Sequence, residues 1–132
     1  MIAQRMSTST AFALLVANTF VATYLLFHFS TLAVHIATQI VTGVSGGRPL
    51  PLKYRQVLLH QTWSSYTLGA FGTAALGTMV NFAVAGYVTE GNLKVVASAA
   101  VFLGVVVSFA VMMAGVLEYA YYWRVLRQAA GD

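Results

Sequence analysis

The chain has 132 residues, of which 59 % are hydrophobic and only 8 % are charged. An average soluble domain carries about a quarter charged residues, so this composition excludes a water-soluble monomer and indicates a protein that lies in a lipid bilayer. The net charge is +4, but the cations sit in short breaks beside apolar runs, so they predict membrane topology and no nucleic-acid partner.

The first predicted helix covers about residues 8–44 and carries a row of polar side chains. At about 100° per residue, seven of them fall on one face, which we call the polar stripe: Tyr24, His28, Thr31, His35, Thr38, Gln39 and Thr42. A polar group without a partner in hydrocarbon is strongly unfavourable. The polar stripe is therefore expected to face protein, a cofactor or water rather than lipid.

The break at residues 45–55 contains a Gly pair, both prolines and three cations, a density that ends a helix. The second predicted helix, about residues 56–88, has a small or polar residue at every fourth position. This row, the small-residue ridge, consists of Ser65, Gly69, Thr73, Gly77, Asn81 and Ala85. Such a row lets helix backbones approach closely, and Asn81 predicts an interhelical hydrogen bond.

The third predicted helix covers about residues 93–127, after a polar turn at residues 89–92. It offers a second row of small residues, which matches the small-residue ridge: Ala100, Gly104 and Ser108. Near its end, an aromatic cluster of the kind found at membrane–water interfaces precedes two arginines: Tyr119, Tyr121, Tyr122 and Trp123, then Arg124 and Arg127.

Crossing the hydrocarbon takes about 20 helical residues, and each predicted helix is longer than that. We therefore predict an all-α polytopic membrane protein, with a single transmembrane domain over residues 1–132 and three long tilted helices in an antiparallel up-down bundle. One side then carries Arg5 and Lys94, and the other carries five cations: Arg48, Lys53, Arg55, Arg124 and Arg127. The positive-inside rule places the C-terminus in the cytoplasm or matrix and the N-terminus outside, across a bacterial or mitochondrial inner membrane.

A candidate cofactor site follows from the depth of the histidines. The first hairpin turns near Arg48, and His35 and His60 are thirteen and twelve residues from it, so they are expected at the same level. Five residues are predicted to bind a cofactor in the inner half of the bundle, with Gln61 beside them: His35, His60, His28, Gln39 and Glu118.

The ligands that fit these residue types are a haem b between the two histidines, which would be the only metal, or a quinone. Bound lipid or a proton path through His and Glu is a further expectation. Alternatively, each His bonds a backbone carbonyl or a Thr on a neighbouring helix.

The sequence contains no motif for a phosphate-binding loop, a nucleophile elbow or a metalloprotease, and it has no Cys. We predict no catalytic residues and no enzyme that acts by itself. Three helices with His near one leaflet resemble, in layout, the membrane anchors of respiratory oxidoreductases. The leading hypothesis is a small accessory or scaffolding subunit of a respiratory or photosynthetic energy-transducing complex, in contact with lipids and other membrane subunits. The alternative is a self-assembling ion or proton channel.

Overall fold

A computed structural model of the chain describes residues 7–88 and 91–131, which are helical almost throughout. The elements, in chain order, are α1 (Thr8–Thr42), β1 (Val44–Ser45), β2 (Arg48–Pro49), α2 (Leu52–Leu58), the π-helix η1 (Leu59–Trp63), α3 (Ser64–Tyr87) and α4 (Gly91–Gly131). The predicted all-α class is confirmed. Three stretches are long and apolar enough to cross a membrane: α1, the run from α2 to α3, and α4.

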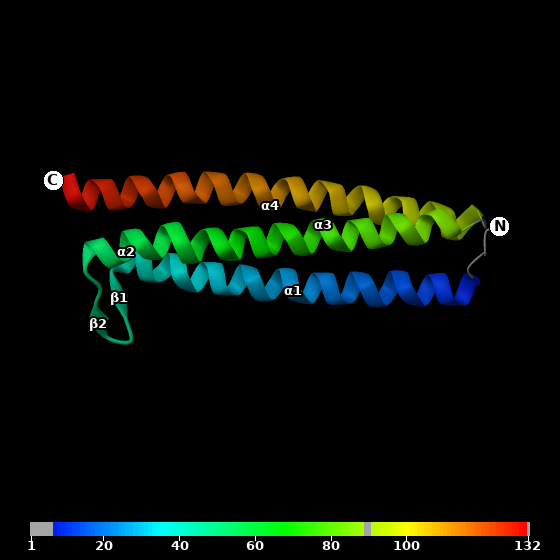
Figure 1. Cartoon of the computed structure of the whole chain (residues 1–132), viewed down its shortest axis with the longest axis horizontal. Helices are drawn as coiled ribbons and strands as arrows, with labels where there is room; N and C mark the ends of the chain where they lie inside the picture. Colours follow the sequence, from blue (N-terminus) through cyan, green and yellow to red (C-terminus); the bar gives the residue numbers. More distant parts are fainter. Residues whose placement is uncertain (1–6, 89–90, 132) are drawn as a thin grey trace.

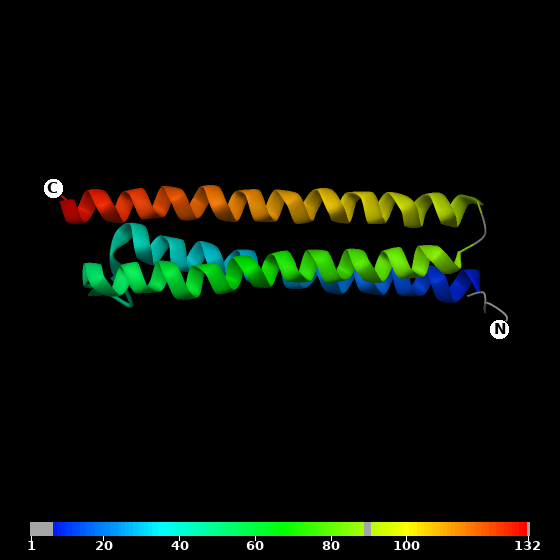
Figure 2. The same ribbon diagram turned by 45° about the horizontal axis from the view of Figure 1, so that its top comes forward.

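The three stretches lie side by side and alternate in direction (Figure 1). The run from α2 through η1 to α3 is continuous, and α3 contacts both α1 and α4, which touch each other much less. In Figure 1 and Figure 2, the C-terminal end of α4 reaches past the connection between α1 and α2. α3 is therefore the central helix, with α1 and α4 packed against different faces of it.

A tight β-hairpin connects α1 to α2. Gly46 and Gly47 have φ angles of 57° and 78°, which suit the two central positions of a hairpin turn that only Gly adopts without strain. The helix then begins at Leu52, whereas the sequence predicted a start near residue 56. Pro51 precedes the helix with φ −59°, and this fixed angle is compatible with a helix start, so the second proline initiates α2 instead of prolonging the loop.

Arg55 closes the end of α1. Its Nε donates to the Ile40 carbonyl at 2.9 Å, and its Nη2 donates to the carbonyls of Ile40 and Val41. The last carbonyls of a helix have no partner within the helix, and here one side chain supplies it. Arg55, counted above as a topology signal, therefore also holds α1 to α2.

Two buried clusters tie the three stretches together, one at each end of the molecule. The cluster near the start of α1 contains Ala11, Leu15, Val84, Ala85, Val88 and Ala97. The cluster near the hairpin contains Ile36, Ala37, Ile40, Leu59, Trp63 and Leu126. Each cluster takes side chains from α1, from the α2–α3 run and from α4, so neither end of the unit depends on a single helix pair.

The small-residue ridge on α3 faces α1. A Cβ placed on Gly69 would lie 2.9 Å from the Phe29 ring, and one placed on Gly77 would also collide with α1. The row on α4 does not meet this ridge as predicted, because a Cβ on Gly104 would lie 2.1 Å from Thr78 Oγ1 on a different face of α3. The contact of α3 with Gly104 is thus made by Thr78, one residue after Gly77 of the ridge.

The interhelical hydrogen bond predicted for Asn81 is confirmed. Asn81 is only 7 % exposed, and its Oδ1 accepts from Asn18 Nδ2 of α1 at 2.8 Å. The same Asn18 amide donates to the Gly77 carbonyl at 2.9 Å, and Asn81 Nδ2 donates to Thr19 Oγ1 at 3.4 Å. This amide pair fixes the rotation of α1 against α3.

Candidate functional site

The polar stripe lies on the side of α1 that points away from α3. The buried residues of α1 are all apolar: Ala11, Leu15, Ile36, Ala37 and Ile40. Six of the seven stripe residues are exposed, and Gln39 is partly buried. The stripe is therefore not buried against the other helices of this chain, and the prediction that it faces protein, a cofactor or water rather than lipid stays a prediction. The physical reason for its exposure is that α1 packs by its apolar face onto the small-residue ridge, which turns the opposite face outward.

Part of the stripe satisfies itself within α1. Thr31, Thr38 and Thr42 each donate a hydroxyl to the carbonyl four residues earlier, at 2.7–2.9 Å. His35 Nε2 lies 3.0 Å from Gln39 Nε2. An amide nitrogen only donates, so the ring nitrogen accepts, and the neutral ring carries its proton on Nδ1. Among the described residues, four outward groups of the stripe have no partner: the Tyr24 hydroxyl, the ring of His28, the His35 Nδ1–H and the Gln39 carbonyl.

His60 lies on a different side of the molecule, between the α2–α3 run and α4. Its Nδ1 is hydrogen-bonded to the Tyr119 hydroxyl, and its ring packs edge-on against Trp123 with centroids 5.1 Å apart. The residue belongs to η1, and single π-helical turns in longer helices often occur at functional sites. Two members of the predicted aromatic cluster, Tyr119 and Trp123, are thus neighbours of His60, while Tyr122 packs on Trp63 instead.

Glu118 occupies a third place, in a groove between α1 and α4 that we call the α1–α4 groove. The groove is lined on α1 by Val34, Thr38 and Thr42, with Glu118 on the α4 side. Its floor includes Trp63, which is 2 % exposed and whose Nε1 lacks a hydrogen-bond partner among the described residues. Thr38 and Thr42 also belong to the polar stripe, so the groove and the stripe form one continuous surface.

The structure therefore separates the predicted cofactor-binding residues. His28, His35 and Gln39 face outward from α1, Glu118 borders the α1–α4 groove, and His60 bonds to Tyr119. A haem held by two histidines needs both rings to face each other across the iron, and this arrangement gives the two rings different neighbours. Among the described residues, no group of three His, Asp or Glu side chains could hold a metal ion.

The predicted depth of the histidines fits the packing. Ile36 is next to His35, Leu59 is next to His60, and both belong to the same buried cluster. The two histidines therefore lie at similar distances from the hairpin along the helix axes. Only the rotation of the two helices differs from expectation. Gln61 is exposed, and its backbone carbonyl accepts from Ser65 Oγ at 2.7 Å. Arg5 and Glu90 lie outside the described residues.

No protein-family model, curated protein or solved structure matches this chain.

Proposed function

We propose that the chain is an integral membrane protein that acts as a helical subunit of a larger membrane assembly. Large apolar side chains are exposed along all three stretches, among them Phe27, Phe82 and Phe109. Side chains of this kind suit lipid or an apolar partner, and the length of the helices supports a crossing by each. The distribution of cations favours an inner membrane with the C-terminus on the cytoplasmic or matrix side.

The observation that carries the proposal is the outward direction of the polar stripe. Lipid would leave the His28 ring, the His35 Nδ1–H and the Gln39 carbonyl without partners, at roughly 1–3 kcal/mol for each group. A neighbouring transmembrane helix that offers its own donors and acceptors removes that cost. The stripe is therefore the contact surface for a partner, and the α1–α4 groove beside it adds the Glu118 carboxylate to the same surface.

The assembly we propose is an energy-transducing complex, respiratory or photosynthetic, in which this chain is an accessory subunit and not an enzyme by itself. Its support is the layout of three helices with His, Gln and Glu side chains toward the cation-rich end. A quinone or haem b held at the partner surface would use side chains from both subunits. A purified complex that lacks Soret absorbance, or whose absorbance is unchanged in His35→Ala and His60→Ala, contradicts haem ligation by this chain.

Site-specific photo-crosslinking tests the partner surface in native membranes. A benzophenone side chain is introduced at Thr31 in the stripe or, as the matched control, at Phe109, which is 73 % exposed on α4. We expect protein adducts from position 31, since a helix covers it, and mainly lipid adducts from position 109. Lipid adducts alone from position 31 contradict the proposal.

A homo-oligomeric channel is the second candidate, and the chemistry of the stripe favours it in one respect. Neutral His and Gln are both donors and acceptors, so two copies of the stripe are complementary to each other, as a symmetric interface requires. In this version the stripes line a pore, and protonation of His28 and His35 gates it. Ion flux through liposomes that contain only this chain is expected for a channel. Absence of flux at both acidic and neutral pH excludes it.

A further inference from the structure

The face formed by η1, α3 and the second half of α4 changes in polarity from an apolar cavity to two arginines. This face lies on the side of His60 and Tyr119, away from the Glu118 carboxylate of the α1–α4 groove. It is a different surface from the partner surface proposed above, although Trp63, in the floor of the α1–α4 groove, also lines the cavity on this face. Ligand binding at this face requires the membrane insertion of the chain but does not depend on any partner subunit.

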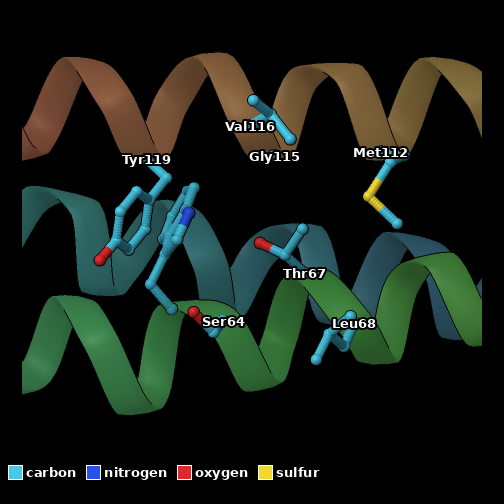
Figure 3. Close-up of a pocket in the computed structure, with 8 residues that line it drawn as sticks. Ser64, Thr67, Leu68, Met112, Gly115, Val116 and Tyr119 are labelled. Atoms are coloured by element: carbon cyan, nitrogen blue, oxygen red, sulfur yellow. The ribbon is translucent and has the colours of Figure 1, made fainter.

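An apolar cavity of about 300 Å³ lies between α3 and α4 at the middle of this face. Figure 3 shows Met112 and Tyr119 extending from α4 at opposite ends of the cavity, with Thr67 rising from α3 between them. The Thr67 hydroxyl and methyl pack against Gly115, where an added Cβ would lie 2.2 Å from Cγ2. Leu68 and Val116 complete a lining that is almost entirely apolar, so the cavity suits a hydrocarbon chain.

The end of the cavity nearest the C-terminus is aromatic and polar. Tyr119 lines the cavity and bonds to His60, and the His60 ring in turn packs against Trp123. Tyr and Trp side chains are enriched at the level where hydrocarbon gives way to lipid headgroups. The hydroxyl and the imidazole at this level are suitable hydrogen-bond partners for the ester carbonyls of a glycerolipid.

Two arginines follow these aromatic rings on α4: Arg124 is next to Trp123, and Arg127 lies one turn beyond it. Trp123, Arg124, Arg127 and Gln128 line a second hollow on α4, at the end that reaches past the other helices in Figure 1. Met112 and Arg127 are 15 residues apart, or about 22 Å along a helix at ~1.5 Å per residue. The described part of α4 has one carboxylate, Glu118, and that side chain borders the α1–α4 groove instead.

From this order of groups we infer a binding site for an anionic phospholipid on the α3–α4 face. One acyl chain occupies the cavity beside Val116, the ester region lies against Tyr119 and His60, and the phosphate pairs with Arg124 and Arg127. The charge of the site selects the lipid class. Two cations favour a headgroup with net negative charge over a zwitterionic one, whose ammonium group would find no described carboxylate on this face.

Native mass spectrometry of the full chain in detergent tests the site, with dioleoylphosphatidylglycerol and dioleoylphosphatidylcholine as the two probes. We expect the anionic lipid to bind more tightly, and Arg127→Gln to weaken its binding about fivefold, the effect expected for loss of one cation near a lipid surface. Arg48→Gln is the matched control, because it removes the same charge from the β-hairpin. Val116→Trp fills the cavity and is expected to reduce the binding of both lipids.

Equal affinity for the two lipids, or equal effects of Arg127→Gln and Arg48→Gln, overturns the site. Competition by inorganic phosphate at the concentration of the lipid would also overturn it, because a simple anion site would then explain the arginines. Alkaline carbonate extraction of membranes distinguishes a failure of the lipid site from a failure of the membrane insertion. If the chain stays in the membrane pellet but does not prefer the anionic lipid, only the lipid site is wrong. If carbonate releases the chain, the membrane insertion is wrong.

Discussion

Replacing Gly104 by Ala tests the close approach of α4 to α3. The new Cβ would lie 2.1 Å from Thr78 Oγ1 and 3.0 Å from Thr78 Cβ. Rotation of the Thr78 hydroxyl away from this contact would break the hydrogen bond that it donates to the Ala74 carbonyl at 2.7 Å. A contact as short as 2.1 Å belongs in the upper part of the range for overpacking, about 2–3 kcal/mol, and the better helix propensity of Ala offsets ~1 kcal/mol of it. The free energy of unfolding should therefore fall by about 1–2 kcal/mol.

Reversible unfolding in mixed detergent micelles, followed by circular dichroism, measures this change. Gly72→Ala is the control, because nothing lies within 4 Å of a Cβ at that position, and it should be neutral or stabilising. Thr78→Ala removes Oγ1, which makes the shortest contact, and Cγ2, so Gly104→Ala should cost much less in the Thr78→Ala background than in the wild type. Full stability of Gly104→Ala, or no recovery in the double variant, would refute the packing of α4 on α3.

Three further predictions concern hydrogen bonds. Asn81→Ala should lower the free energy of unfolding by about 1–2 kcal/mol, because Asn18 loses its buried partner; an unchanged unfolding curve contradicts this. Arg55→Gln should cost about 1 kcal/mol and speed amide hydrogen exchange at the end of α1, where carbonyls lose their donor. Tyr119→Phe should shift the imidazole nitrogen resonances of His60, because the phenol hydroxyl is its partner; an identical spectrum shows that the bond is absent.

The sequence was sufficient to predict how far the histidines lie from the hairpin, but not which face each helix turns toward its neighbours. The position of the turn places His35 and His60 at the same distance from the hairpin, and the cluster that contains Ile36 and Leu59 agrees with it. Either the apolar face of α1 or its polar stripe could pack against the ridge on α3, and the packing energy decides between them. The Asn18–Asn81 pair settles this choice, and Asn18 is an isolated polar residue with no periodic pattern to mark it.

Local backbone features were predicted in part. The Gly pair and the prolines predicted the break between the helices. However, α2 begins at Leu52, before the predicted start near residue 56, because Pro51 is the N-cap of the helix and not part of a longer loop. The π-helical turn at η1 has no sequence signal comparable to a Gly pair or a proline. It lies where Leu59 and Trp63 enter the buried cluster while His60 meets α4, an outcome of packing that one helix by itself does not encode.

The native mass of the detergent-extracted particle tests the central claim most directly. A single chain has a mass of 14.1 kDa. If the polar stripe is a partner surface, the wild-type particle contains additional chains, and the variant His35→Leu/Gln39→Leu dissociates to the single-chain mass because the outward polar groups are gone. A wild-type particle that carries only one chain, gently extracted from its own membrane, contradicts the account.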